Sequence, residues 1–587
     1  MTVEKLITDH IDIWSSALQT RSTAGRGSNG KIDLYGIKKL RELILELAVR
    51  GKLVPQDLND EPASELLKRI AAEKAELVKQ GKIKKQKPLP EISEDEKPFE
   101  LPSGWEWSSI QNLCLLENGD RGKNYPNKST LTETGVPFVN AGHLLNGKID
   151  EAEMTFIKES HYESLRSGKF LPGDILFCLR GSLGKSALVG NIFGAIASSL
   201  VIVRVYPLVN SKYIHFYFDS PISYQFIKKY DNGTAQPNLA ANDLARFLIP
   251  VPPLDEQIRI LGKTDALMSL CDQLEQQSLT SLDAHQQLVE TLLSTLTDSQ
   301  NADELAESWA RISQHFDTLF TTEASIDALK QTILQLAVMG KLVSQDPNDE
   351  PASELLKRIA QEKAQLVKEG KIKKQKPLPP VSDEEKPFEL PQGWEWCRII
   401  EIAQVGTGAT PSRDNPDYWQ YPELNWVTSG ETSLPFIFNT AEKISLKAVK
   451  ETNVSIYSPG TLIIAMYGQG KTRGQITELC ISAGTNQACA AIQLFNTNEY
   501  HRRYIKLFFE KSYKDLRNLA AGGAQPNLNL AKVSNTLIPI PPFSEQIKIA
   551  TKIEELFKVC DTLKSRLQGV QQTQLHLADA LTDAALN

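Results

Sequence analysis

The chain has 587 residues, which is too long for a single hydrophobic core, so we expect several domains. Its 65 Lys and Arg and 72 Asp and Glu give a formal charge of −7, which excludes a uniformly basic nucleic-acid coat but not local basic faces. Seven cysteines without a CxxC pair argue against a zinc site or a disulfide framework and fit a reducing cytoplasm. We expect no signal peptide and no membrane span, because no apolar run approaches about 18 residues.

Helical spacing of apolar residues recurs along the chain. The predicted helices cover residues 1–20, 31–49, 62–80, 255–297 and 544–585. Gly51 and Gly81 follow the second and third of these helices and are typical helix terminators. Residues 21–30 have the composition of a flexible linker, and residues 82–102, basic and then rich in proline and acid, predict an extended connector.

One block of sequence occurs twice, at a constant offset of 289 residues. Residues 44–107 and 333–396 are identical at most paired positions, and both end in GWEW. The offset returns in the tetrapeptide QPNL, which begins at Gln236 and at Gln525, and in the motif PxPPxxEQ that follows each. Between these islands the two copies have diverged almost completely. The pattern indicates two modules that hold similar positions but recognise different things.

Each insert, at about 101–250 and 390–539, mixes apolar strand-like runs with turn signals, so we expect an α+β fold. The helix after the first insert would be about 60 Å long at 1.5 Å per residue. The last helix places apolar residues at steps of 4, 3, 4 and 3, the spacing of a coiled-coil seam, at Leu556, Cys560, Leu563, Leu567 and Val570. We therefore predict two α/β domains joined by long helices that form an antiparallel coiled coil with pseudo-two-fold symmetry.

No segment satisfies the pattern of a catalytic centre. The run GQGKT ends at Thr472, but a phosphate-binding loop needs a glycine six positions before its lysine, where this chain has Ala465. The tetrapeptide NPDY at 415–418 is one residue from the NPPY motif of adenine methyltransferases, and no cofactor-binding G-x-G strand accompanies it. We therefore expect a non-catalytic chain that binds no metal or cofactor itself.

The remaining signals favour binding. In each insert a glycine-rich loop with cations follows an apolar strand; glycine permits close backbone approach, and Lys and Arg neutralise phosphates or read guanine. A hairpin turn with solvated charges is the alternative. The basic loop at 120–128 and its counterpart at 408–414 could read bases or be plain surface, and the QPNL residues could fix a turn or grip backbone common to all sequences. The candidate DNA-binding residues are Arg121, Lys123, Tyr125, Lys128, Arg180, Ser182, Lys185, Gln236, Asn238, Thr410, Ser412, Arg413, Tyr467, Gln469, Lys471, Thr472, Arg473, Gln525 and Asn527.

Two further basic runs, at 79–87 and 368–376, are nearly identical to each other. Such runs are usually solvated, and their identity makes them poor candidates for distinguishing two sequences. Phosphate contact and docking to an acidic partner both stay open.

The order of these motifs resembles the specificity subunit of type I restriction-modification enzymes. It consists of PxGWEW, a GD-x-L strand at 173–176, QPNL, IPxPPxxEQ and a long helix, twice over and covering nearly the whole chain. The second copy departs at the strand, where Thr461 stands in place of Asp174, and this puts a shared functional role of Asp174 in doubt.

The resemblance implies that each insert is a target-recognition domain that reads one half of a split, asymmetric site in double-stranded DNA. The helices would set the gap between the halves and dock two methyltransferase subunits. Those subunits would carry S-adenosylmethionine and methylate adenine at N6, and restriction subunits would use ATP and Mg for translocation and cleavage. This chain would be a non-catalytic, cytoplasmic member of that complex.

The resulting domain prediction is an N-terminal helix and linker (1–30), a helical region and connector (31–100), target-recognition domain 1 (101–253), a central long helix (254–298), a second helical region and connector (299–389), target-recognition domain 2 (390–542) and a C-terminal long helix (543–587). Two alternatives stay open. One is an independent adenine methyltransferase with degenerate motifs, and the other is a scaffold that bridges protein partners without contacting DNA.

Overall fold

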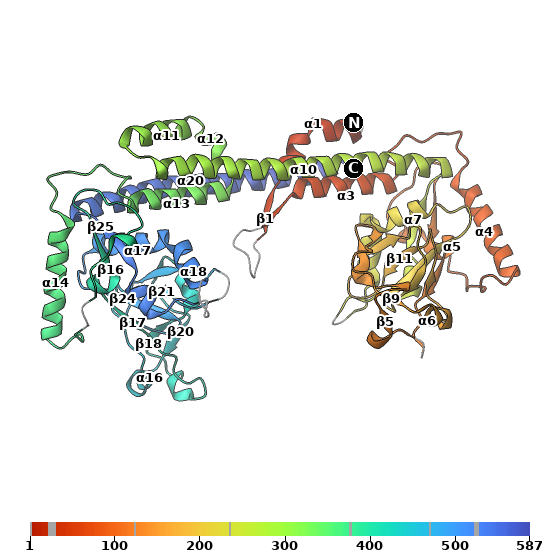
Figure 1. Ribbon diagram of the computed structural model, residues 1–587. Coiled ribbons are helices and arrows are strands. Elements are labelled where there is room, and N and C mark those ends of the chain that lie inside the picture. The colour runs from red at the N-terminus through yellow and green to blue at the C-terminus, as the bar shows by residue number, and fades with distance from the viewer. Residues whose placement is uncertain are drawn as a thin grey trace. The chain divides into compact units, whose positions relative to one another are not determined.

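The computed structural model describes residues 3–21, 31–122, 125–233, 236–374, 378–468, 471–521 and 527–586. Residue contacts divide the chain into two compact units. Unit 1 comprises Met1–Gln19, Leu34–Ser278 and Thr573–Asn587, and unit 2 comprises Thr20–Asp33 and Leu279–Gln572. The fold is mixed helix and sheet, with two sheet-rich domains and long helices, as predicted (Figure 1).

The two longest helices are α10 (Leu254–Asp298) and α20 (Phe543–Leu586), at the positions that helical spacing predicts. The division into units falls within both helices, so each unit holds the first part of one and the last part of the other. The other helices of unit 1 are α1 (Val3–Asp9), α2 (Ile11–Ser16), α3 (Tyr35–Val49), α4 (Ala63–Lys79), α5 (Ile110–Leu113), α6 (Glu159–Ser164), α7 (Ser211–Phe218), α8 (Pro221–Tyr230) and α9 (Ala241–Leu244). Those of unit 2 are α11 (Ala302–Gln314), α12 (Phe316–Leu319), α13 (Glu323–Val338), α14 (Ala352–Lys368), α15 (Ile399–Ile402), α16 (Leu446–Glu451), α17 (Glu499–Lys511), α18 (Tyr513–Ala521) and α19 (Leu530–Ser534).

Within unit 2, α13 runs antiparallel to the first part of α20. Lys330 of α13 pairs with Asp561 of α20, and Asp327, one turn earlier on α13, pairs with Lys564, one turn later on α20, at 3.1 Å. The last part of α10 runs parallel to α13 instead. His285 of α10 lies 3.0 Å from the carbonyl oxygen of Leu319, which precedes α13.

The other end of α13 fixes the direction of α10. Lys341, which follows α13, donates to the carbonyl of Thr297 near the end of α10 at 2.6 Å. Because α13 is parallel to α10 and antiparallel to α20, the two long helices run antiparallel within unit 2.

Unit 1 contains the equivalent contacts, each displaced by 289 residues. Arg41 of α3 pairs with Asp272 of α10 at 2.7 Å, in the positions of Lys330 and Asp561. Lys52 after α3 donates to the carbonyl of Leu586 at the end of α20 at 2.5 Å, in the positions of Lys341 and Thr297. The duplicated sequence therefore folds into duplicated helix packing.

The predicted seam of α20 is correct over its first four positions. Cys560 is buried, and Leu556, Leu563 and Leu567 pack partly buried against the core of unit 2. Val570 is wrong as a seam residue, since it is 54% exposed. The cause is the position at which α13 begins. Its first residue, Glu323, accepts a hydrogen bond from Gln568 of α20, so no residue of α13 is left to cover Val570.

Two helix predictions near the N-terminus need correction. Residues 1–20 do not form one helix, because the chain breaks at His10 between α1 and α2. The helix predicted from Lys31 begins at Tyr35, since β2 (Lys31–Asp33) pairs with β1 (Gln19–Arg21) in a two-stranded sheet.

Each insert is closed at its base by its own first and last strands. In unit 1, β3 (Glu106–Ser109) pairs with β15 (Leu248–Val251), and Trp107 lies opposite Pro250. In unit 2, β16 (Glu395–Arg398) pairs with β25 (Leu537–Ile540) in the same register. The insert therefore leaves and rejoins the frame at one place, and its interior can change without moving the frame.

The two inserts share one sheet order despite their different sequences. The other strands of unit 1 are β4 (Cys114–Asn118), β5 (Leu131–Thr132), β6 (Val136–Val139), β7 (Leu144–Leu145), β8 (Lys148–Ile149), β9 (Phe156–Ile157), β10 (Lys169–Phe170), β11 (Ile175–Cys178), β12 (Ser186–Leu188), β13 (Gly194–Ile196) and β14 (Leu200–Val205). Those of unit 2 are β17 (Ala403–Thr407), β18 (Leu424–Val427), β19 (Phe436–Ile437), β20 (Glu442–Ile444), β21 (Leu462–Ala465), β22 (Ile476–Leu479), β23 (Ala483–Thr485) and β24 (Cys489–Leu494). The order β4-β14-β11-β12 in unit 1 matches β17-β24-β21-β22 in unit 2, where β19 adds a fifth strand parallel to β22. Both units also contain an equivalent parallel pair, β6 with β13 and β18 with β23.

Candidate nucleic-acid interface

In unit 1, loops that are distant in sequence meet at one end of the β4-β14-β11-β12 sheet. Leu179, directly after β11, donates its N–H to the carbonyl of Ser199 at 2.8 Å. Its own carbonyl accepts from the N–H of Leu239 at 2.9 Å. These bonds place the glycine-rich loop at 179–185 beside the QPNL segment, as a common binding surface requires.

Asn238 of the QPNL segment fixes this junction. Its Oδ1 accepts from Arg180 Nε at 2.9 Å, and its Nδ2 donates to Asn232 Oδ1 at 2.8 Å. Asp231 accepts from the N–H of Asn238 at 2.9 Å, and such backbone bonds hold the pKa of this carboxyl below its usual value. The side chain of Asn238 therefore serves the turn, whereas Gln236 stays exposed.

The basic loop at 120–128 reaches the same place from the other side. Arg121 Nη2 donates to the carbonyl of Ser198 at 3.4 Å, and the N–H of Ser198 donates to the hydroxyl of Tyr125 at 3.3 Å. The Tyr125 ring packs edge-on against Phe138 with ring centroids 6.1 Å apart, so it also supports the core. The buried carboxylate of Asp120 accepts two backbone N–H bonds, which lower its pKa and hold the loop in place.

Unit 2 repeats this arrangement at equivalent positions. Met466 donates its N–H to the carbonyl of Ala488 at 2.7 Å, and its carbonyl accepts from the N–H of Leu528 at 3.3 Å. Thr410 Oγ1 donates to Gln487 Oε1 at 2.5 Å. The backbone of the meeting place is thus common to both units, while the side chains on it differ.

The candidate residues divide into three groups by their contacts. The exposed side chains that make no bond to another described residue are Ser182, Lys185, Gln236, Tyr467 and Lys471. The residues engaged within their own unit, or partly buried there, are Arg121, Tyr125, Arg180, Asn238, Thr410, Ser412, Arg413, Thr472, Arg473 and Asn527. Lys123, Gln469 and Gln525 lie outside the described residues, as does the side chain of Lys128.

Arg413 is committed to packing inside unit 2. It pairs with Glu442 at 2.6 Å, and its guanidinium carbon lies 3.8 Å from the centre of the Trp419 ring. The Trp419 indole in turn donates to the carbonyl of Ser412 at 3.0 Å. These contacts stabilise the small lobe around β18, β20 and α16 and leave Arg413 less available to a ligand than Lys471.

The retained motifs form a structural clamp. Trp105 of GWEW donates its indole N–H to Glu256 Oε2 at 3.0 Å, and Gln56 donates to Glu256 Oε1 at 3.2 Å. Burial raises the pKa of Glu256, although both hydrogen bonds oppose that shift. Gln257 donates to the carbonyl of Pro252 at 3.0 Å. The clamp joins the loop after α3, which carries Gln56, to the base of the insert and to the start of α10.

Unit 2 has the same clamp with one addition. Trp394 and Gln345 donate to Glu545 at 2.9 and 3.0 Å. In addition, Nδ1 of the buried His501 lies 3.0 Å from Gln546 Oε1, and Nε2 of this ring has no hydrogen-bond partner among the described residues. Burial lowers the pKa of His501 to about 4, so the ring is neutral at pH 7.

A family model described as the type I restriction modification DNA specificity domain matches residues 102–284 and 391–572. The chain belongs to the specificity-subunit family of type I restriction-modification systems. It is 52% identical over 614 residues to the EcoEI specificity subunit and 50% identical over 621 residues to the EcoAI specificity subunit, both from Escherichia coli, with 100% of each chain covered. A chain from a solved type I R-M system shares 18% identity with a TM-score of 0.49, covering 84% of this chain and 99% of that one.

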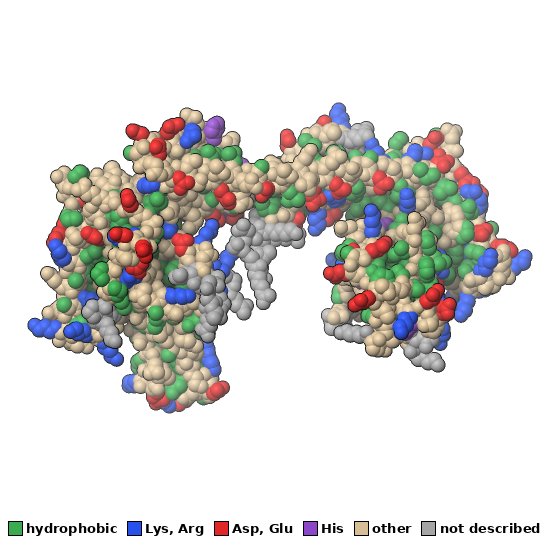
Figure 2. Space-filling model, viewed as in Figure 1, with side chains coloured by type: hydrophobic (Ala, Val, Ile, Leu, Met, Phe, Trp, Pro, Cys, Tyr) green, Lys and Arg blue, Asp and Glu red, His purple; other side chains and the backbone are tan. Residues whose placement is uncertain are grey.

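The surface of this specificity subunit mixes both charge signs. Lys and Arg are interspersed with Asp and Glu over each unit in the view of Figure 2, in keeping with the formal charge of −7. Among the described residues no group of three or more His, Cys, Asp and Glu side chains could hold a metal ion, and no helix is long and apolar enough to cross a membrane.

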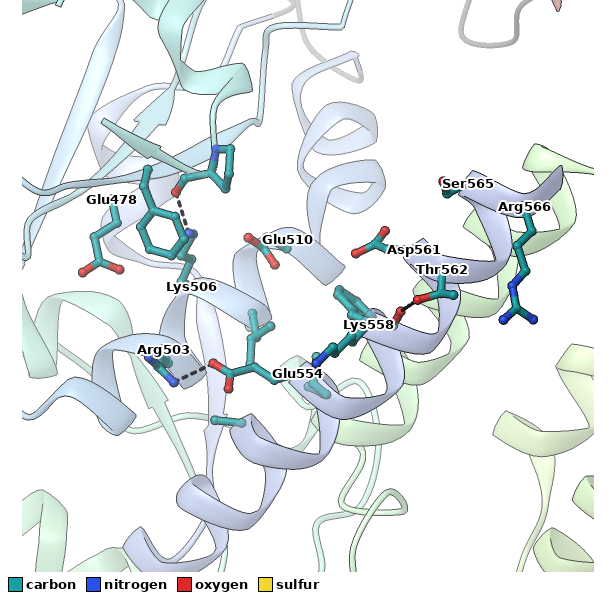
Figure 3. Close-up of a pocket in the computed structure, with 16 residues that line it drawn as sticks. Glu478, Arg503, Lys506, Glu510, Glu554, Lys558, Asp561, Thr562, Ser565 and Arg566 are labelled. Atoms are coloured by element: carbon teal, nitrogen blue, oxygen red, sulfur yellow. Dashed lines mark hydrogen bonds and ion pairs between the residues drawn. The ribbon is translucent and has the colours of Figure 1, made fainter. Parts of the chain in front are cut away.

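A hollow of about 730 Å³ lies in unit 2 where the insert meets α20 (Figure 3). Charged side chains bridge it: Arg503 of α17 donates to Glu554 of α20 at 2.5 Å. Lys506 donates to the carbonyl of Pro435 at 2.6 Å and lies over the Phe436 ring at 3.7 Å. The bond between Arg503 and Glu554 attaches the second insert to α20, and the contacts of Lys506 hold α17 within the insert. We therefore assign the hollow to the junction and not to a small-molecule site.

Two features of this specificity subunit are absent from the predictions made from its sequence. Ser198 and Gln487, at the centre of the two meeting places, occupy equivalent positions with different side chains in the turn before β14 and β24; the 289-residue offset points to this pair. The helix pair α1–α2 is also repeated as α11–α12, at an offset of 305. His10 and His315 mark the break in both pairs, and their carbonyls accept the equivalent backbone bonds. This second repeat can be found in the sequence, but its offset of 305 residues differs from the offset of 289 that relates the other repeated segments.

Proposed function

We propose that each insert of this specificity subunit reads one half of a bipartite, asymmetric site in double-stranded DNA. The observation that carries the proposal is the pairing of a common backbone with different side chains where the loops meet. A shared backbone suits a shared docking mode on the duplex, and different polar side chains suit different bases. Lys185, Gln236, Tyr467 and Lys471 are the exposed side chains best placed to contact DNA.

The chain itself is non-catalytic in this proposal. The long helices set the gap between the half-sites and dock two methyltransferase subunits, which supply S-adenosylmethionine for N6-adenine methylation. Restriction subunits join through that complex, act with ATP and Mg, and the assembly works in the cytoplasm. The 45 residues of α10 span about 68 Å at 1.5 Å per residue, which exceeds the roughly 34–36 Å of one DNA turn. The family match supports neither an independent methyltransferase nor a scaffold that avoids DNA.

The test is methylation mapping in cells that express this chain with the methyltransferase subunit of its system. We expect a single N6-methyladenine motif made of two different half-sites separated by a fixed gap. A contiguous motif, or methylation by the purified chain alone, would contradict the proposal. Absence of any motif although both proteins are expressed and associate would favour the scaffold.

A further inference from the structure

Two pairs of lysines lie outside the meeting places of both units. Lys84 and Lys85 follow α4, and Lys373 and Lys374 occupy the same positions after α14. All four are exposed, and none makes a bond to another described residue. Residues 77–90 and 370–381 contain no acidic side chain, so no neighbour in sequence neutralises them. Lys and Arg side chains gather around the free ends of α4 and α14 in Figure 2.

The connector that carries these lysines is fixed to the insert. Lys74 of α4 donates to the carbonyl of Gln111 in α5 at 2.8 Å, and Gln111 Nε2 donates to the carbonyl of Lys87 at 2.9 Å. Lys84 and Lys85 precede this anchored residue by at most three positions, so they lie within about 10 Å of it along the chain. In unit 2, Lys363 donates to the carbonyl of Ile400 at 2.8 Å, the equivalent bond. In unit 1 the lysines therefore belong to the body that carries the insert, and in unit 2 the bond of Lys363 holds α14, which precedes Lys373 and Lys374, against the second insert.

The near identity of these runs calls for a ligand that is the same in both units. The inserts beside these runs have diverged almost completely. The anchoring bonds end on backbone carbonyls, so they do not require the exposed side chains of the two runs to be alike. Phosphates are identical at every DNA sequence, whereas base edges differ between half-sites. Lysine provides a flexible point charge that suits phosphate without demanding a fixed geometry.

We propose that Lys84 and Lys85, together with Lys373 and Lys374, hold the phosphate backbone of the duplex next to each half-site. The inference rests on the proposed function, because it takes the neighbouring insert to read DNA. These contacts carry no sequence information and supply affinity that is equal for every sequence. In unit 1, Lys229 and Arg246 line a hollow of about 310 Å³ with Pro88 of the connector, where the carboxylate of Glu96 offsets part of their positive charge.

The experiment compares two quadruple variants in the complete complex with methyltransferase subunits. The test variant carries Lys84→Gln, Lys85→Gln, Lys373→Gln and Lys374→Gln. The control removes the same charge through Lys68→Gln, Lys97→Gln, Lys357→Gln and Lys386→Gln, whose side chains each pair with an acid at 2.6 to 2.8 Å. Binding is measured at several salt concentrations for two duplexes, one that contains the motif identified by methylation mapping and one that lacks it.

We expect the test variant to lose about 10- to 100-fold in affinity for both duplexes and to flatten the slope of log K against log salt by about 2 to 4, while the control keeps both values. The methylated motif itself stays unchanged. An unchanged salt slope overturns the inference, and so does loss of methyltransferase subunits from the complex, which would assign the lysines to an acidic protein surface. A wild-type complex without a bipartite motif would instead refute the proposed function, and the two failures are therefore distinguishable.

Discussion

Trp105 donates its indole N–H to Glu256 across 151 residues of sequence, and Trp394 donates to Glu545 across the same 151 residues in the second copy. Everything between each pair is one insert. The bond ties the base of the insert to the first turn of a long helix, so the insert is held at a fixed place whatever its sequence. This explains why GWEW and the Glu-Gln of PxPPxxEQ persist in both copies while the residues between them diverge.

The clamp formed by Trp105, Gln56 and Glu256 should contribute to the stability of unit 1. Glu256→Ala leaves the Trp105 indole and the Gln56 amide without their acceptor, and we expect a loss of about 2–3 kcal/mol in the free energy of unfolding of unit 1. Glu256→Gln keeps one acceptor oxygen and should cost less. Urea unfolding followed by tryptophan fluorescence measures both, with the exposed neighbour Asp255→Asn as the matched control. Equal stability of Glu256→Ala and the control would show that the clamp contributes nothing.

The buried His501 should make the stability of unit 2 depend on pH. Burial holds its pKa at about 4, below the ordinary value of 6.5, so the folded state favours the neutral ring. The associated stability is complete above pH 6.5 and is lost as the pH falls towards 4; at pH 5 the loss is about 2 kcal/mol. Urea unfolding at pH 7 and pH 5 should show this difference in the wild type and a smaller one in His501→Asn. The same pH response in both proteins would remove His501 as its cause.

Asn238 makes a prediction about the first half-site. Asn238→Ala removes the bonds to Arg180 and Asn232 that fix the QPNL turn, so the loop at 179–185 loses its support. We expect binding to fall severalfold for duplexes with an intact first half-site and no effect on discrimination at the second. Lys185→Ala should weaken the same half-site without changing stability. Binding competition with duplexes altered in one half-site at a time separates these results, and equal losses at both halves would contradict the assignment.

Lys471 and Arg473 make the matching prediction for the second half-site. Lys471→Ala and Arg473→Ala should each weaken recognition of one half-site only, by about 1–3 kcal/mol where a base contact is lost. The exposed Lys471 should act without loss of stability, whereas the partly buried Arg473 should lower stability as well. Methylation rates on duplexes with single half-site changes provide the measurement. Loss at both half-sites, or at neither, would count against this loop.

Local signals in the sequence were enough for part of the fold. The apolar periodicity of residues 255–297 and 544–585 predicts α10 and α20 to within two residues, because a helix is specified by neighbours three and four positions away. Val570 fits the same periodicity but is exposed, since burial depends on where the partner helix α13 begins. Strand pairing such as β6 with β13 joins residues far apart in sequence, and no periodicity records it.

The candidate site, like the fold, could be predicted only in part from the sequence. The recurrence of loops at the 289-residue offset was visible in the sequence, and it pointed to the segments that meet around Ser198 and Gln487. Which side chains stay available was only partly visible. For Asn238 the sequence left a turn and a grip on the DNA backbone open, and its hydrogen bonds serve the turn. Arg413 looks like a ligand contact in the sequence, yet Glu442 and Trp419 engage it. Their commitment depends on neighbours that only the folded chain brings together.

We propose that each insert reads one half-site independently of the other. The most direct test is a chain in which residues 397–538 are replaced by residues 108–249, so that one insert occurs twice within the retained frames. Its methylation motif is mapped with the same methyltransferase subunit and compared with that of the wild type. We expect one wild-type half-site to appear twice, in inverted orientation, and the other half-site to be lost. An unchanged motif, in a protein that still folds and assembles, would show that the exchanged insert does not read a half-site.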